Sequence, residues 1–334
     1  MVHPKRLLFF LSFVWACGTD PEDKEPTDSS EPDSGTEDTD SEGLPAPEGD
    51  PATVPLEGAC PMASDLGGFV VEIDLDYSIV DGSVLDAVVP TSVLTEEAAV
   101  GDCQLLRREN PFCDPVCESG FTCSLEGECV PFPSEQNLGN VTVAGLVADV
   151  IMEPREPGAR YYDTTLPHPA VDPGTLVELR TAPDGVLGEL VLHGVGPEPL
   201  ESLDEELVVV AGRPLSVSWT PAAADVRTHV EFFLNIDQHG SSPLRISCLF
   251  PDTGSGEVDA ALIQGLVAGG VTGFPSARLR RQTVDHALTD DGCMDFGVAS
   301  PRFVGVQVDG FTPCTDDDDC PDGQTCNRAL EICE

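Results

Sequence analysis

Lysine is almost absent from this chain of 334 residues, and none follows Lys24. The absence excludes the mechanisms that need a lysine in the folded part, such as a P-loop, a Schiff base or a kinase site. Lys and Arg together number 16 against 60 Asp and Glu, which gives a formal net charge of -44. Nucleic-acid binding needs a basic surface, so we expect no nucleic-acid partner.

Catalytic motifs are missing as well. The chain contains no G-x-S-x-G, no H-E-x-x-H and no G-x-x-x-x-G-K. The segment from Asp252 to Ser255 (DTGS) resembles the aspartic-protease motif, but that mechanism needs two aspartates that share a proton. The only other D-[ST]-G lies at Asp33, in a stretch predicted to be disordered, so a turn rich in Asp and Gly is the preferred interpretation. We therefore expect no enzyme activity and no catalytic residue.

Metal-ligand patterns are weak. The histidines beyond His3 are scattered, and none sits at metal-ligand spacing from another: His168, His193, His229, His239 and His286. Carboxylates suit calcium, and the densest run of them is Asp316, Asp317, Asp318, Asp319 and Asp322. Smaller clusters are Asp74, Asp76 and Asp81, and Asp290, Asp291 and Asp295. None matches EF-hand spacing, and such runs in loops are usually solvated, so we expect no cofactor, with calcium as the alternative.

The N-terminus has the features of an export signal. A short basic region at residues 3–6 precedes the apolar run Leu7–Val14, which is shorter than the about 20 residues that span a bilayer. The sequence Val14-Trp15-Ala16-Cys17 resembles the lipobox of bacterial lipoproteins. The resemblance implies a signal peptide at 1–16, a lipid on Cys17 that holds the protein to a membrane, and a place in the cell envelope. The anchor would be in the outer membrane, with the protein periplasmic or surface-exposed. The alternative is an ordinary secreted protein from which Cys17 is cut away.

An acidic stretch follows the candidate lipidation site. Residues 18–54 contain thirteen Asp or Glu against Lys24 alone, and large apolar side chains are almost absent. Such a composition cannot bury enough apolar surface to offset the entropy of ordering. We therefore predict that residues 17–54 are a lipidated cysteine and a disordered tether that holds the folded part clear of the membrane.

Twelve further cysteines in an exported chain predict about six disulfides. They are Cys60, Cys103, Cys113, Cys117, Cys123, Cys129, Cys248, Cys293, Cys314, Cys320, Cys326 and Cys333. Proximity in the sequence suggests the pairs Cys60–Cys103 and Cys248–Cys293. The other eight form two tight clusters that share the pattern C-x-x-G-x-T-C, so they predict a repeated disulfide module at 113–134 and 313–334.

Each cluster leaves its pairing open, since four cysteines allow three patterns. A four-cysteine zinc site is the alternative, although zinc knuckles usually contain C-x-x-C pairs, and neither cluster has one. Gly120 and Gly323 occupy equivalent positions where a tight turn would need a positive φ. The C-terminal cluster resembles the small cysteine-rich repeats of the Dickkopf N-terminal type, which implies an extracellular module.

The body of the chain has the period-two alternation of β-strands. We predict strands at Val71–Ile79, Val141–Val150, Leu176–Leu179, Leu187–Leu192, Leu207–Val210, Leu215–Trp219, Val230–Ile236, Leu244–Phe250 and Phe303–Val308, and one short helix at Val258–Leu266. Short strands separated by Pro and Gly indicate an all-β fold, a β-sandwich of immunoglobulin-like or jelly-roll type. The expected domains of this body are an N-terminal β subdomain at 55–112, which could instead pair with the rest, and a sandwich at 135–312.

The order of lipobox, acidic tether, β body and cysteine modules is similar to that of uncharacterised surface lipoproteins of predatory Gram-negative bacteria. The resemblance covers the whole chain and implies no activity. The main hypothesis is a non-enzymatic envelope lipoprotein that binds a protein or glycan or takes part in adhesion. The alternatives are a purely structural lipoprotein and a hydrolase with an unrecognised site. A pocket that holds carboxylates with raised pKa would support the hydrolase.

Overall fold

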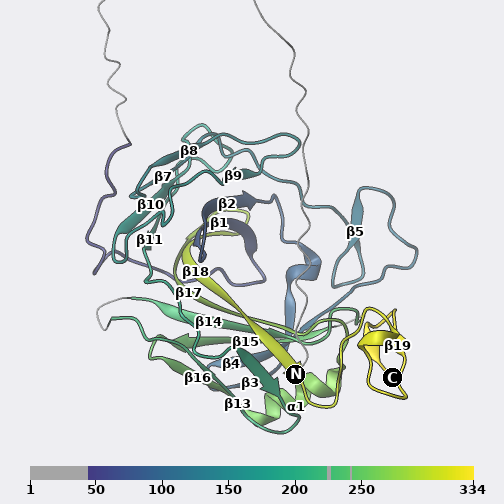
Figure 1. The fold of residues 1–334 in the computed structure, drawn as a ribbon. Helices are drawn as coiled ribbons and strands as arrows, with labels where there is room; N and C mark the ends of the chain where they lie inside the picture. Colours follow the sequence, from purple (N-terminus) through teal and green to yellow (C-terminus); the bar gives the residue numbers. More distant parts are fainter. Residues whose placement is uncertain (1–43, 224–226, 241–242) are drawn as a thin grey trace, which may run out of the picture. The chain divides into compact units, whose positions relative to one another are not determined.

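A ten-stranded sheet is the framework of the fold (Figure 1). The structure is a computed structural model that describes residues 44–223, 227–240 and 243–334. The strand order is β3 (Leu94–Val100), β4 (Cys103–Arg108), β15 (Leu244–Pro251), β14 (His229–Asn235), β17 (Ser276–Leu288), β18 (Cys293–Val308), β1 (Asp65–Ile73), β2 (Ser78–Val84) and β9 (Tyr161–Asp163), and β12 (Glu206–Val209) also pairs with β18. The predicted all-β sandwich with two small disulfide-rich modules is confirmed.

Two hydrophobic cores lie against different parts of this sheet. The first core joins β14, β15 and β17 to β12, β13 (Leu215–Ser218), β16 (Ser255–Val258) and α1 (Ala260–Gly269), with Trp219 fully buried within it. The second core joins β1, β2 and β18 to the four-stranded sheet β11 (Val191–Val195), β10 (Leu176–Arg180), β7 (Val141–Ala144) and β8 (Val150–Met152). Strand β18 contributes to both cores, with Phe296 and Val298 in the second and Val304 and Val308 in the first.

The clearest alternation patterns correspond to strands. Burial alternates residue by residue along β14 and over most of β15, because side chains on a strand point to opposite faces in turn. The predicted strands near 176, 207 and 215 appear as β10, β12 and β13. The short predicted helix is α1, which begins where Asp259 accepts a hydrogen bond from the Ala261 amide (2.7 Å) and ends at Gly270, whose φ is 124°.

Two predicted strands are each divided by a turn. The alternating run 71–79 is not one strand, because the chain reverses after Asp74, whose amide donates to the Tyr77 carbonyl (3.0 Å), and β1 then pairs with β2. The run 141–150 is divided at Gly145, whose φ of 86° favours glycine, into β7 and β8. The strand predicted at 187–192 begins only at Val191.

Strands of the predicted N-terminal subdomain pair with strands from the rest of the body. Strand β1 lies parallel to β18 and pairs with β2, whereas β4 pairs with β15 on the other side of the same sheet. The last part of the predicted tether also contacts this body. Val54 is buried against Leu176 and Val195, and Arg227 donates to the Val54 carbonyl (2.5 Å). Apolar burial and this hydrogen bond hold the segment against the body, so the expected disorder of 44–54 is wrong.

Six disulfides join the twelve cysteines, so the disulfide interpretation is confirmed over the zinc alternative. The two long-range pairs predicted from sequence proximity are wrong. The observed pairs are Cys60–Cys293 and Cys103–Cys248. Strand pairing explains both, because Cys103 lies directly opposite Cys248 in the β4–β15 ladder, and the Cys293 amide at the start of β18 is bonded to the Ser64 carbonyl (2.8 Å) near Cys60. Among the described residues no helix is long and apolar enough to cross a membrane.

Candidate binding site

The first cysteine module, residues 113–134, is a short hairpin held by two disulfides. Strands β5 (Phe121–Cys123) and β6 (Cys129–Pro131) pair with each other only. The bridges are Cys113–Cys123 and Cys117–Cys129. A segment this short has almost no core of its own, so the bridges must fix its backbone. Its side chains are therefore free to face outward on a rigid support.

Large apolar side chains are exposed on this module. The exposed apolar group, as we name it, has exposed fractions from 40% to 77%. It consists of Val116, Phe121, Leu125 and Phe132 of the module and of Phe112, which directly precedes the module. Exposed aromatic and aliphatic side chains gathered on one small module are typical of protein-interaction surfaces. This gathering contrasts with the strongly acidic composition of the chain.

A pocket of about 620 Å³ lies beside the exposed apolar group. The module lines it with Leu125, Val130 and Phe132, and the body lines it with residues of the loop 86–93. Its walls are mainly apolar, with Asp86 and Glu126 as the charged residues. A pocket of this size could receive a large side chain of a partner protein.

A polar clamp holds the module to the body at the pocket. The Asp86 carboxylate accepts hydrogen bonds from the Ser134 amide (2.8 Å) and the Ser134 hydroxyl (2.6 Å). The Asp86 amide in turn donates to the Ser134 carbonyl (3.0 Å). The hydrogen bonds from Ser134 lower the pKa of Asp86, so its carboxylate stays ionised at a lower pH than that of an ordinary aspartate.

A second candidate site is a group of arginines on the sheet face opposite the first core. Arg278 and Arg280 lie on β17 and Arg245 on β15, around Glu231 of β14. We name this the arginine face. Sequence reasoning missed it, although the alternation of Arg278 and Arg280 with buried Ala277 and Leu279 is a period-two signal.

Carboxylates with raised pKa line a pocket of about 260 Å³ at this face. Burial, together with the nearby Asp65, raises the pKa of Asp295 to about 6, against the opposing effect of Arg280. Burial also raises the pKa of Glu231, and the surrounding arginines only partly offset it. Perturbed carboxyl groups in a pocket are the feature that the hydrolase hypothesis requires.

Asp252 of the DTGS segment is a structural anchor. Its carboxylate accepts hydrogen bonds from the Arg281 Nε (2.6 Å), the Trp219 Nε1 (2.8 Å) and the Thr228 hydroxyl (2.7 Å). Burial tends to raise the pKa of Asp252, but these hydrogen bonds outweigh it and the pKa lies below its usual range. Trp219 is a fully buried member of the first core, so the predicted turn anchors this core and is not merely a solvated loop.

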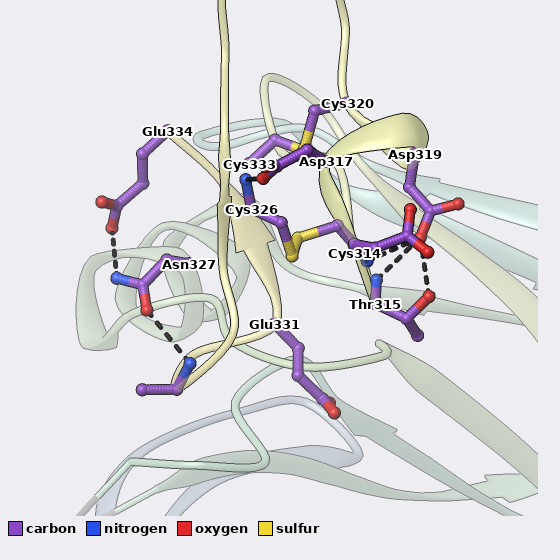
Figure 2. Close-up of a disulfide and its surroundings, with 12 residues drawn as sticks. Cys314, Thr315, Asp317, Asp319, Cys320, Cys326, Asn327, Glu331, Cys333 and Glu334 are labelled. Carbon is purple, nitrogen blue, oxygen red and sulfur yellow. Dashed lines mark hydrogen bonds between the residues drawn. A yellow bond between two sulfur atoms is a disulfide. The ribbon is translucent and has the colours of Figure 1, made fainter.

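The acidic loop of the second cysteine module uses several of its carboxylates internally (Figure 2). Asp319 accepts from the Thr315 amide (2.7 Å) and hydroxyl (2.8 Å), and Asp317 accepts from the Cys326 amide (2.8 Å). Asp316 accepts from the Asp318 amide (3.0 Å) at the start of the short 3-10 helix η2 (Asp317–Asp319). No hydrogen bond within the described chain engages the side chains of Asp318 or Asp322. The calcium site therefore stays a prediction for which these two are the uncommitted ligands.

The two cysteine modules share their pairing. Cys314–Cys326 and Cys320–Cys333 repeat the first-to-third and second-to-fourth bridges of the first module, and β19 (Cys326–Asn327) pairs with β20 (Ile332–Cys333). Gly120 and Gly323 have φ of 90° and 91°, which confirms the predicted turns. Among the described residues, every group of three potential metal ligands within 4.8 Å contains a disulfide-bonded cysteine, whose sulfur is a poor ligand.

The remaining candidates take part in separate contacts. Asp74 lies 3.3 Å from an Arg302 guanidinium nitrogen, and Asp81 lies 2.7 Å from one of Arg160. The histidines have different partners: His168 bonds Ser78, His193 lies between Glu178 and Asp285, His229 contacts Gln282, His239 bonds Glu331, and His286 bonds the Gly58 carbonyl. The structure does not bring them together. Cys17, Asp33 and the predicted signal peptide lie outside the described residues.

Comparison with known proteins gives no family. No family model matches the chain, and no curated protein matches it. A search of solved structures matches the FN1–FN3 domains of chicken CNTN1 with 10% identity and a TM-score of 0.18. The match covers 64% of this chain and 66% of the chicken protein fragment, so this chain spans just under two thirds of the length of that fragment. Likeness at this level carries no argument, and function must be argued from the sites themselves.

Proposed function

We propose that this protein is a non-enzymatic binding module of the cell envelope that recognises a protein partner through the first cysteine module. The observation that carries the proposal is the exposed apolar group beside the 620 Å³ pocket. Burial of such side chains by a partner would contribute about 25 cal/mol per Å² of apolar surface. The disulfides and the Asp86–Ser134 clamp hold these side chains in place, so little further ordering would be needed on binding.

Membrane attachment through a lipid on Cys17 is the second part of the proposal. The lipobox-like sequence and the acidic stretch after it support attachment with the binding module held away from the membrane. Replacement of Cys17 with Ser should move the protein from the membrane fraction to the soluble fraction of the cell envelope. Equal fractionation of the two forms would disprove the anchor and leave the binding module untouched.

Site-specific photo-crosslinking in intact cells tests the binding surface. A photoreactive residue at Phe112 or at Phe132 should form an adduct with another protein that mass spectrometry can identify. The matched control is the same residue at Leu203, which is 65% exposed outside the module. Adducts at Leu203 that equal those at the module, or no adduct at either module position, would contradict the proposal and favour a purely structural lipoprotein.

A hydrolase is the second candidate function, and the raised pKa values of Glu231 and Asp295 in one pocket are the observation that favours it. The carboxyl with the higher pKa would act as an acid and the other as a base. A panel of chromogenic ester, peptide and glycoside substrates tests it, with Glu231→Gln as the matched inactive variant. Turnover that this substitution abolishes would establish a hydrolase and overturn the non-enzymatic proposal.

A further inference from the structure

The arginine face places three guanidinium groups around one carboxylate. In the antiparallel ladders Glu231 lies directly opposite Arg280, and Phe233 lies directly opposite Arg278. Residues opposite each other in such a ladder point to the same side of the sheet. Arg245 shares this side, since its guanidinium carbon lies 5.2 Å from the centre of the Phe233 ring, and that of Arg278 lies 5.4 Å from the same centre.

The charge balance of this face is opposite to that of the whole chain. Five arginines elsewhere in the described chain form ion pairs within 4.0 Å of a carboxylate, namely Arg107, Arg160, Arg180, Arg281 and Arg302. Arg245, Arg278 and Arg280 form none with any described residue, although 60 acidic residues are available in the sequence. The Glu231 carboxylate lies among them, and burial raises its pKa against the opposing effect of the three arginines.

Buried polar atoms on this face also lack partners. The Nε atoms of Arg245 and Arg280 and the Oε1 atom of Gln282 are inaccessible to solvent and bond to no described residue. Burial and the neighbouring Arg278 lower the pKa values of Arg245 and Arg280. The surroundings therefore destabilise the charged forms of these two guanidinium groups. Native proteins rarely leave buried polar atoms unsatisfied, and a bound ion is one of the reasons for which they do.

We propose that Arg245, Arg278 and Arg280 form a binding site for a small oxyanion, such as a phosphate, sulfate or carboxylate group, free or carried on a small ligand. A guanidinium presents a planar set of donors that matches two oxygens of such a group. The Phe233 ring contacts both flanking guanidinium groups and holds them before binding. The adjoining 260 Å³ pocket gives room for the remainder of a small ligand.

The surrounding charge restricts the ligand to a small one. The net charge of -44 repels a long polyanion, which would extend beyond the arginines over the rest of a strongly acidic chain. A small oxyanion contacts only the arginines, and at physiological salt the more distant acidic groups are screened beyond about 8 Å. The site is separate from the exposed apolar group, so its test and that of the protein partner are independent.

Titration calorimetry with inorganic phosphate and with sulfate tests the site, on the chain from residue 17 onward with Cys17→Ser. Chloride at equal ionic strength is the reference, because sulfate and phosphate stabilise proteins without binding to a site. We expect saturable binding of at least one of the two oxyanions. Arg278→Gln should weaken it at least ten-fold, and Glu231→Gln should tighten it, because a carboxylate that repels the anion is removed from among the arginines. Arg213→Gln, at an exposed turn, is the matched control and should leave the affinity unchanged.

Arg245→Gln provides a second weakening variant in case Arg278→Gln fails to fold, and circular dichroism checks the fold of each. The absence of saturable binding of either oxyanion would overturn the proposal, and so would binding that is equal in the Arg278→Gln, Arg245→Gln and parent chains. Binding of heparin without binding of inorganic oxyanions would also overturn it, since the ligand would then be a polyanion.

Discussion

Arg281 and Asp252 form a buried ion pair in which the Nε and Oδ2 atoms lie 2.6 Å apart and the side chains are 1% and 5% exposed. Arg281 also donates to the carbonyl groups of Pro199 (3.1 Å) and Thr220, and so ties three separate segments to β17. The pair therefore organises the edge of the first core, where the sequence contains the protease-like DTGS.

Loss of one partner of this pair should be strongly destabilising. Asp252→Ala leaves the Arg281 charge buried without compensation, and we expect about 3–5 kcal/mol less free energy of unfolding, measured by urea denaturation. The exposed pair of Asp81 and Arg160 is the control, and Asp81→Ala should cost about 0–1 kcal/mol. A cost for Asp252→Ala as small as that of the control would show that the pair has no structural role.

The two kinds of disulfide should differ in what they stabilise. The Cys60–Cys293 bridge joins cysteines with a sequence separation of 233. The Cys60→Ser/Cys293→Ser variant should therefore lose about 2–5 kcal/mol of the free energy of unfolding of the body. The Cys117–Cys129 bridge joins cysteines only 12 positions apart in the sequence, in a module outside both cores. Its removal should expose residues 113–134 to limited proteolysis without lowering the melting temperature of the body. A body that melts earlier in the second variant would show that the module supports the sandwich.

Asp295 should make stability depend on pH. Its folded pKa of about 6 lies above the ordinary aspartate pKa of 3.8, so the folded state binds more protons between these values. Stability therefore falls as the pH rises from about 4 to about 6, and the loss is complete above that. Asp295→Asn should be more stable than the parent chain by about 1–3 kcal/mol at pH 7.5 and equal to it at pH 4. Denaturation at both pH values checks this, and a constant difference would refute a raised pKa.

Calcium binding at the acidic loop is tested by thermal melting with calcium, with magnesium and with chelator at fixed ionic strength. A site built on the uncommitted Asp318 and Asp322 should raise the melting temperature by several degrees with calcium alone, since calcium accepts looser oxygen coordination than magnesium. Asp318→Asn/Asp322→Asn should abolish the shift. Equal effects of the two ions would remove the calcium hypothesis, because screening of a highly negative chain explains them.

The sequence predicts strands well where one face is apolar and the other polar. Strand β14 shows this clearly, and its bounds are close to those predicted. The prediction fails at Asp74–Tyr77, because the alternation of apolar and polar residues continues through the hairpin turn between β1 and β2. Counting the alternation alone cannot detect such a turn. It also misses β17, where Arg280 and Arg281 point to opposite faces. Arg281 pairs with Asp252 and Arg280 lies opposite Glu231, and only the fold brings these residues near one another.

The candidate sites were predictable to different degrees. The repeated spacing of the cysteine modules indicates their disulfides, because a module without a core has few alternatives. The partners of Cys60 and of Cys103 could not be predicted from nearby sequence, since the sheet places each of them beside a cysteine more than a hundred residues away. The exposed apolar group has no sequence signal that separates it from core residues, because exposure depends on what the rest of the chain covers.

The bridge between Cys60 and Cys293 also determines how the molecule would bear mechanical load. A pull on the N-terminal side of the chain reaches Cys60 before it reaches β1, and the bridge passes it directly to the start of β18. The load therefore enters the longest strand of the sheet, which is bonded to β17 and β1 on its two sides. A load that enters there is shared with a neighbouring strand on each side and does not fall on an edge strand.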